Sequence, residues 1–250
     1  MVKVAAELRY SETAFVQPNG DGHFTLRYFT PCSEVDLCGH ATIASFGVLR
    51  YLGIVTDGDT CINHTRAGDL TVSIGEQVMM QMATARAVET SIDLSHLHRI
   101  MGIPANSPVA LPPAVISTGL PDIILPVSDV DTLNTLTPDM DALAALSQEM
   151  QVVGVHAFAM TDDGYTAHVR NFAPLYGIPE ESATGTANAA LTHYLARHGL
   201  VSIPSQCRFL QGETMGRPSV VTTTLSLEGT IRVGGSCSIV ACGTLHVPSN

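Results

Sequence analysis

The chain has 250 residues and a formal net charge of −11 at pH 7, with 12 Lys and Arg against 23 Asp and Glu. Contacts to phosphate need clustered basic side chains, so this balance excludes nucleic acid and anionic membrane surfaces as partners. Hydrophobic residues make up 45% and charged residues 14%, which indicates a globular chain with a sizeable core. No apolar run approaches the roughly 18 residues of a membrane span.

The predicted elements mix strands and helices along the whole chain. Alternating or β-branched segments predict strands at residues 13–17, 23–29, 70–74, 78–82, 112–115, 123–127, 152–160, 166–172, 220–227, 230–233 and 237–245. A short helix ends near residue 8, and capping signals or closing glycines predict further helices at residues 39–52, 93–101, 137–149 and 185–197. Asn19-Gly20-Asp21-Gly22 predicts a hairpin between the first two strands. The pattern is that of an α/β chain.

Two stretches of the sequence repeat one another. In the first half, RYFTP at residues 27–31 leads to GHAT at residues 39–42, which begins an apolar helix. In the second half, RNFAP at residues 170–174 leads to GTAN at residues 185–188, which begins another. Both helices are apolar on most sides and are therefore predicted to be buried. Two homologous domains explain this repeat economically.

We place the two domains at residues 1–105 and 106–250. A helix N-terminus offers unpaired backbone N–H groups and the positive end of the helix dipole, and Gly39 and Gly185 would let an anion approach them closely. If the repeat produces pseudo-two-fold symmetry, both N-termini face one cleft that suits a small molecule with a carboxylate. The alternative is two ordinary buried helices that begin with glycine.

The loops around the repeat also carry titratable side chains, which favours the functional interpretation. His40 lies in the first turn of a helix, where the dipole disfavours imidazolium, so we expect a neutral imidazole. Cys38 is expected to be a buried thiol. The complete set of titratable candidates is Glu12, Asp36, Cys38, His40, Glu180 and Glu181.

At these loops the sequence resembles a known family. The motifs are SETAF at 11–15, RYFTP at 27–31, EVDLCGHAT at 34–42, GIPEESATGTA at 177–187, QG at 211–212 and GRPS at 216–219. In this order and spacing, from about residue 2 to about residue 245, they resemble the phenazine-biosynthesis PhzF-like family of isomerases. The set is specific, whereas any one of these motifs alone is weak.

The resemblance implies a diaminopimelate-epimerase-like fold, with two pseudo-symmetric α/β domains that each wrap a mixed, curved sheet around a central helix. It also implies proton transfer between carbon atoms of a small carboxylate-bearing substrate, without a cofactor, in a homodimer. Six scattered cysteines and the lack of an apolar leader predict a cytoplasmic location.

The resemblance also implies roles for individual residues. Glu12 would be the acid/base, because one carboxyl can both take and return a proton if burial raises its pKa. His40 and Glu181 would orient the substrate or relay protons. The residues matching the substrate-binding positions are Gly39, Thr184, Gly185 and Thr186.

Several positions depart from the family pattern. Glu181 stands where the family has Asp and Ser182 where it has Pro, so the carboxylate is one methylene longer on a freer backbone. Thr186 replaces the usual Ser. Family members usually begin earlier, with a first strand and a Gly-Asn-Pro segment, so we expect the first sheet to lack some pairing partners.

Other functions fit the sequence less well. A two-thiol racemase of this fold needs a cysteine in each half, and the place matching Cys38 in the second half is taken by Ala183. The ten histidines show no metal-ligand spacing, so no metal is expected. The strongest rival is a catalytically impaired ligand-binding or scaffold homologue of the same fold.

Overall fold

The computed structural model describes residues 1–104, 107–108 and 111–246. Its contacts define two compact units: Met1–Val78 together with the described residues from Ser236 onward, and Met79–Gly235. The expected boundary between residues 105 and 106 lies outside the described residues, and the chain divides instead between Val78 and Met79. None of the helices in the described part of the chain has the length and apolar character needed to cross a bilayer.

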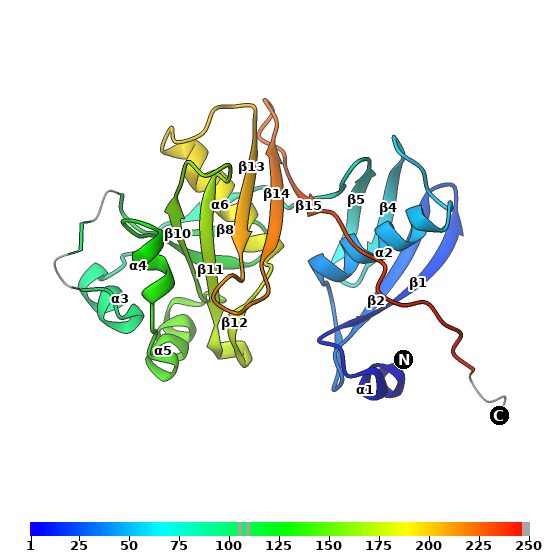
Figure 1. Ribbon diagram of the computed structural model, residues 1–250, viewed down its shortest axis with the longest axis horizontal. Coiled ribbons are helices and arrows are strands. Elements are labelled where there is room, and N and C mark those ends of the chain that lie inside the picture. The colour runs from blue at the N-terminus through cyan, green and yellow to red at the C-terminus, as the bar shows by residue number, and fades with distance from the viewer. Residues whose placement is uncertain (105–106, 109–110, 247–250) are drawn as a thin grey trace. The chain divides into compact units, whose positions relative to one another are not determined.

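The first unit is a four-stranded sheet with one buried helix (Figure 1). Its strands follow the order β1-β2-β4-β5, in which β2 and β4 are parallel and the outer pairs antiparallel, and the short β3 pairs with the end of β2. Phe46 of the helix is fully buried and packs edge-on against Phe24 of β2, with ring centroids 5.3 Å apart. The elements are α1 (Val2–Leu8), β1 (Thr13–Gly20), β2 (His23–Phe29), β3 (Glu34–Val35), α2 (Gly39–Tyr51), β4 (Thr60–Thr65) and β5 (Gly68–Ile74).

The second unit is a larger mixed sheet with the order β6-β15-β14-β13-β11-β10-β9-β8-β7, and β12 pairs with β11. Its strands are β6 (Val78–Gln81), β7 (Arg86–Val88), β8 (Ala114–Ser117), β9 (Pro121–Pro126), β10 (Val155–Met160), β11 (Ala167–Ala173), β12 (Ile178–Glu181), β13 (Ser205–Gln211), β14 (Ser219–Leu225) and β15 (Ile231–Gly235). Its helices are α3 (Leu94–Met101), α4 (Val130–Thr135), α5 (Met140–Met150) and α6 (Gly185–Arg197), with a 3-10 turn at Pro174–Tyr176.

The two faces of this sheet bury different helices, because successive residues of a strand point to opposite sides. Ile124 and Phe158 face α6, where they pack with Leu191 and Tyr194. Their neighbours Ile123, Leu125 and Ala157 belong to a separate core with residues of α3, α4 and α5. Because α3 shares this core, it belongs to the second unit, which moves the boundary well before residue 105.

The repeat seen in the sequence is present in the topology. Strands β1-β2-β4-β5 and β10-β11-β13-β14 both follow the pattern antiparallel, parallel, antiparallel, and each set has its own 13-residue helix. A guanidinium clamp repeats as well: Arg27 binds both oxygens of Glu34 at 2.8 Å, and Arg170 binds both oxygens of Glu180 at 2.9 and 2.8 Å. The predicted α/β class is confirmed.

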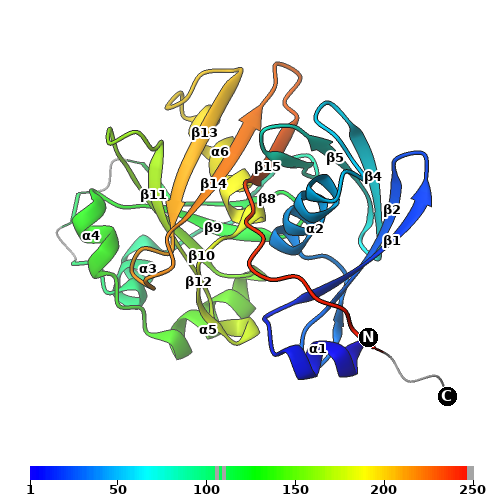
Figure 2. The same ribbon diagram turned by 45° about the vertical axis from the view of Figure 1, so that its right-hand side comes forward.

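Two local expectations need correction, and strand β4 was not predicted. The helix predicted at 137–149 begins at Met140, because the side chain of Asp139 caps it by accepting from the N–H of Ala142. The strand predicted at 237–245 is irregular chain that runs alongside α2 (Figures 1 and 2). There Cys237 lies so close to Gly47 that a Cβ at residue 47 would overlap its sulfur. Strand β4 was missed because its inward-facing Asn63 breaks the apolar alternation.

Candidate active site

The helices differ in how their N-termini are capped. In α3, α4 and α5 the side chain of an aspartate accepts a backbone N–H of the first turn, and these caps are Asp93, Asp129 and Asp139. Helices α2 and α6 begin at glycine after an extended Cys38 or Thr184, and neither has a side-chain cap. Their first-turn N–H groups and positive dipole ends are therefore left for a ligand.

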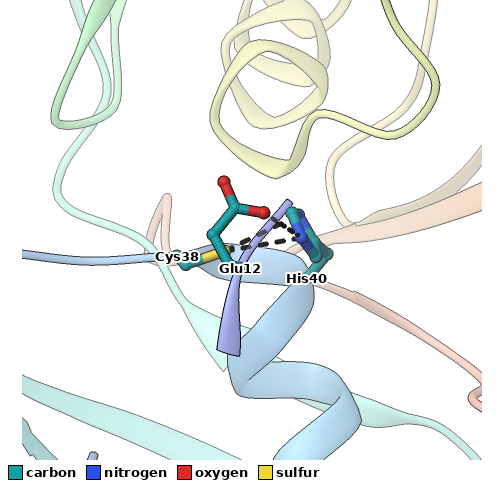
Figure 3. A group of neighbouring side chains, drawn as sticks. All are labelled: Glu12, Cys38 and His40. Atoms are coloured by element: carbon teal, nitrogen blue, oxygen red, sulfur yellow. Dashed lines mark hydrogen bonds and ion pairs between the residues drawn. The ribbon is translucent and has the colours of Figure 1, made fainter. Parts of the chain in front are cut away.

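In the first unit, three titratable side chains gather at the N-terminus of α2 (Figure 3). Glu12 immediately precedes β1, and its Oε2 lies 3.0 Å from Nε2 of His40, the second residue of α2. The side chain of Glu12 is 22% exposed and that of His40 is 47% exposed. The pair is thus anchored in the protein and open to solvent on the imidazole side.

The sulfur of Cys38 lies beneath this pair. It is 3.7 Å from Nδ1 and 3.6 Å from Nε2 of His40, and Cys38 is only 8% exposed. The extended backbone of Cys38 directs its carbonyl into α2, where it accepts from the N–H and the hydroxyl of Thr42 at 3.0 and 2.8 Å. The expected buried thiol is present, and it contacts the imidazole.

These contacts reverse two electrostatic expectations. The hydrogen bond with Cys38, followed by the approach of Glu12, raises the pKa of His40 to about 10, although burial opposes this shift. The neutral imidazole expected from the helix dipole is therefore wrong. The approach of His40 lowers the pKa of Glu12 despite the opposing effect of burial, so the expected raised pKa is also wrong. At neutral pH the pair is a carboxylate and an imidazolium.

In the second unit, Glu181 and Thr184 form a cluster with Gln211 at the N-terminus of α6. The hydroxyl of Thr184 donates to Oε2 of Glu181 at 2.8 Å and accepts from Nε2 of Gln211 at 3.0 Å. Gln211 also donates to the carbonyl of Glu181 at 2.7 Å and accepts from the N–H of Thr184 at 3.1 Å. The amide of Gln211 thereby holds Glu181 and the N-cap residue Thr184 of α6 in place.

A buried polar chain supports this cluster from below. Nδ2 of Asn188 donates to the carbonyl of Thr184 and to Oε1 of Gln211, both at 2.9 Å. Burial lowers the pKa of His156 to about 4, so its imidazole is neutral. Its Nε2 lies 3.2 Å from Oδ1 of Asn188 and its Nδ1 3.3 Å from Nδ2 of Asn171, which assigns the proton to Nε2.

Two further groups border the cluster. Asp122 on β9 is fully buried, and its Oδ1 has no hydrogen-bond partner among the described residues. Burial and the charge of Glu181 raise the pKa of Asp122 to about 8, so it is protonated at neutral pH. In the first turn of α6, the carbonyl of Thr186 accepts from the hydroxyl of Thr118 at 2.9 Å.

Residues 1–243 match the family model described as phenazine biosynthesis-like protein. The chain belongs to this family. It is 33% identical to an uncharacterized isomerase of Deinococcus radiodurans, across 96% of this chain and 82% of the relative. It is 29% identical to a trans-2,3-dihydro-3-hydroxyanthranilate isomerase of Pseudomonas chlororaphis, across 88% of this chain and 77% of that one.

The structure agrees with this membership. The phenazine biosynthesis protein of the PhzF family from Bacillus anthracis superposes with a TM-score of 0.84 at 26% identity, covering 94% of this chain and 85% of the other. The predicted diaminopimelate-epimerase-like fold is thereby confirmed, and the protein is an isomerase of the phenazine biosynthesis-like family.

The residues predicted for the site of this isomerase fall into two groups, one in each unit. The first comprises Glu12, Gly39 and His40, and the second comprises Glu181, Thr184, Gly185 and Thr186. An added Cβ at Gly185 would be 3.4 Å from the side chain of Val233, which is ordinary van der Waals contact. Asp36 takes no part in the first group, since it pairs with Arg66 at the surface.

Sequence reasoning overlooked several polar residues of the second group. Gln211 belongs to one of the family motifs, but no role was predicted for it. Asn188 belongs to the repeated segment. No pattern in the sequence pointed to His156 or Asp122. The pairing of Cys38 with Ala183 was wrong, because both Cys38 and Thr184 are N-caps whose carbonyl accepts from the side chain of the fourth helical residue.

Proposed function

We propose that Glu12 moves a proton between two carbon atoms of a small carboxylate-bearing substrate, without a cofactor. The carboxylate of Glu12 takes a proton from carbon, and the electron pair left behind moves into the substrate's unsaturated system. The resulting carboxylic acid then returns the proton to another carbon, which regenerates the carboxylate and completes an isomerisation. His40 holds Glu12 in place and supplies positive charge beside the reacting atoms.

The observation that carries this proposal is the Glu12–His40 contact of 3.0 Å at an uncapped helix N-terminus. The lowered pKa of Glu12 keeps it ionised at neutral pH, as a base requires. The free N–H groups of a helix start stabilise negative charge on the substrate as the proton leaves.

We assign carboxylate recognition in each unit to a helix start that lacks a side-chain cap, α2 in the first unit and α6 in the second. Gly39, Gly185 and Thr186 offer backbone N–H groups to a carboxylate, and Thr184 holds Glu181 so that it orients the substrate. The relative from Pseudomonas chlororaphis is named for a cyclic amino acid with a carboxylate, a class that fits such anion-binding groups.

Solvent exchange observed by ¹H NMR in D₂O tests the proposal. Small hydroxy and amino acids, with trans-2,3-dihydro-3-hydroxyanthranilate among them, are incubated with the wild type and Glu12→Gln. Loss of a substrate C–H signal that depends on Glu12 supports the isomerase. The matched control is Glu7→Gln, which alters an exposed glutamate of α1 in the same unit and should exchange like the wild type.

The same panel separates the isomerase from a binding homologue. Ligands that bind, as measured by calorimetry, yet show no exchange with the wild type would identify a carboxylate-binding protein and remove Glu12 from catalysis. Exchange that persists in Glu12→Gln would place the acid/base elsewhere.

We also propose that the protein is a cytoplasmic homodimer. None of its six cysteines forms a disulfide, which fits a reducing compartment. The dimer rests on the family resemblance alone. Size-exclusion chromatography with light scattering tests it: a mass near twice 26.4 kDa supports the dimer, and a mass near 26.4 kDa refutes it.

A further inference from the structure

The cluster of Glu12, Cys38 and His40 has a second chemical capacity, because it offers carboxylate oxygen, sulfur and imidazole nitrogen to one point (Figure 3). One ligand atom from each residue lies within 4.8 Å of the other two. The three side chains come from two segments, the start of β1 and the first turn of α2, so the fold brings them together. From this arrangement we propose that the site binds Zn²⁺, and that the ion inhibits the enzyme.

Two of the three separations between the ligand atoms lie near those of a tetrahedral ion, and the third is at most 4.8 Å. Bonds of about 2.3 Å to sulfur and about 2.0–2.1 Å to nitrogen or oxygen place tetrahedral ligand atoms roughly 3.3–3.6 Å apart. The sulfur of Cys38 is 3.6 Å from Nε2 of His40, and Oε2 of Glu12 is 3.0 Å from the same nitrogen. Seating the ion requires the imidazole to turn until Nε2 points between the sulfur and the carboxylate, because the sulfur now lies almost equally far from both ring nitrogens.

The ligand atoms also make few well-directed hydrogen bonds with one another. Oε2 of Glu12 is buried and makes no aligned hydrogen bond, although it lies beside His40. The sulfur of Cys38 is almost equally distant from both ring nitrogens, so neither ring N–H is directed along a single bond to it. An ion between the three groups would meet lone pairs that the side chains alone leave unpaired.

The donor set selects the metal. A thiolate and an imidazole favour Zn²⁺ over Mg²⁺ or Ca²⁺, which prefer oxygen ligands. Three protein ligands leave a fourth position for water, and the half-exposed imidazole gives the ion a route from solvent. The metal takes thiolate and neutral imidazole, so any proton on Cys38 or His40 passes to solvent when the ion binds.

Inhibition rests on the proposed function of Glu12, whereas binding does not. A carboxylate coordinated to Zn²⁺ has its lone pair engaged and cannot accept a proton from carbon. Zinc would therefore switch the isomerase off reversibly, and a chelator would restore it.

Cobalt spectroscopy tests the site without any substrate, since Co²⁺ occupies zinc sites and shows a thiolate-to-metal charge-transfer band. We expect one such band per wild-type chain, displaced by one equivalent of Zn²⁺. The band should disappear in Cys38→Ser. In His40→Gln, affinity for Zn²⁺ should fall at least as far as the roughly 10- to 100-fold loss caused by removing an outer-shell partner.

Two control variants test whether the band comes from this site or from another thiol or imidazole of the first unit. Cys32→Ser removes an exposed thiol and should leave the band unchanged. His64→Gln breaks the surface contact in which Nδ1 of His23 lies 3.0 Å from Nε2 of His64, and it should also keep the band. A wild type without the band, or a band that survives in Cys38→Ser, overturns the metal site.

The exchange assay then tests inhibition. Stoichiometric Zn²⁺ should abolish exchange by the wild type, and a chelator should restore it. Exchange that continues with the site fully occupied would refute inhibition by the ion. If the wild type exchanges no substrate at all, the proposed isomerase mechanism fails, while the cobalt spectrum still decides metal binding by itself.

Discussion

Oε2 of Glu12 lies 3.0 Å from Nε2 of His40, and this contact favours the charged form of both side chains. It lowers the pKa of the carboxyl and contributes to raising that of the imidazole to about 10. The base of the proposed reaction is thus charged before substrate arrives, and its partner carries the opposite charge.

The pH dependence of kcat/KM follows from these directions. Activity should fall at acid pH as Glu12 is protonated, with an apparent pKa below its ordinary value of 4.5, and at alkaline pH near 10 as His40 is deprotonated. In His40→Gln the alkaline decrease should vanish and the acid limb should move upward, because the main cause of the lowered pKa is gone. An acid limb that stays in place would show that His40 does not control Glu12.

The same pair makes stability depend on pH. The lowered pKa of Glu12 adds stability that is complete above 4.5 and lost as pH falls through the lower value; the raised pKa of His40 adds stability that is complete below 6.5 and lost as pH rises towards 10. Urea unfolding should therefore show the largest difference between wild type and His40→Gln near pH 5.5. Equal differences at pH 5.5 and 10 would contradict the pair.

Burial of Asp122 should make the protein less stable as pH rises. Its folded pKa of about 8 exceeds the ordinary 3.8, so the unfolded chain ionises first and stability declines as pH rises from 3.8 to 8. Asp122→Asn removes this dependence and should stabilise the protein at pH 8 relative to pH 5, by an amount on the order of a few kcal/mol. Denaturant unfolding at both pH values measures it, and the same effect at both would argue against a protonated Asp122.

Gln211 should govern substrate binding through the N-terminus of α6. In Gln211→Met, the N–H of Thr184, the carbonyl of Glu181 and Nδ2 of Asn188 all lose a partner. Each buried group without a hydrogen-bond partner costs about 1–3 kcal/mol, so the free energy of unfolding should fall measurably. We also expect KM to rise more than kcat falls, because Glu12 is untouched. A variant that unfolds earlier with unchanged KM would confine Gln211 to a structural role.

Gly154 should tolerate no side chain. A Cβ there would overlap the carbonyl of Phe172 on β11, which is backbone and cannot move aside. Gly154→Ala should lower the free energy of unfolding by about 2–4 kcal/mol. Gly75→Ala is the control, since its Cβ would meet only ordinary contact at 3.7 Å. Similar unfolding midpoints for the two variants would contradict the close packing of Gly154 against the carbonyl of Phe172.

The sequence was informative where structure is local. The apolar stretch between Gly185 and Gly199 predicted the bounds of α6, and the first hairpin turn followed from glycines and Asp21, which adopt positive φ. The N-cap of helix α5 was placed two residues early, because the pattern could not distinguish Thr137 from Asp139 as the N-cap.

The position of the Glu12–His40 pair could be predicted from the sequence, but the charges of the two side chains could not. Motifs located Glu12 and His40, yet the contact between these residues, 28 positions apart in the sequence, lowers the pKa of Glu12, and Cys38 together with Glu12 raises that of His40. The dipole argument for His40 considered only its own helix and omitted Cys38 and Glu12. The buried chain from His156 to Gln211 was out of reach because its members come from separate strands and a helix, and only the fold brings them together.

The central claim is that Glu12 carries the proton. Its most direct test compares single-turnover rates of isomerisation by wild type and Glu12→Gln, with substrate affinity measured by calorimetry for both. We predict a rate loss of about 10²–10⁴-fold with nearly unchanged affinity, because the amide can neither accept nor return the proton. A rate within tenfold of the wild type, with substrate bound as before, would contradict the account.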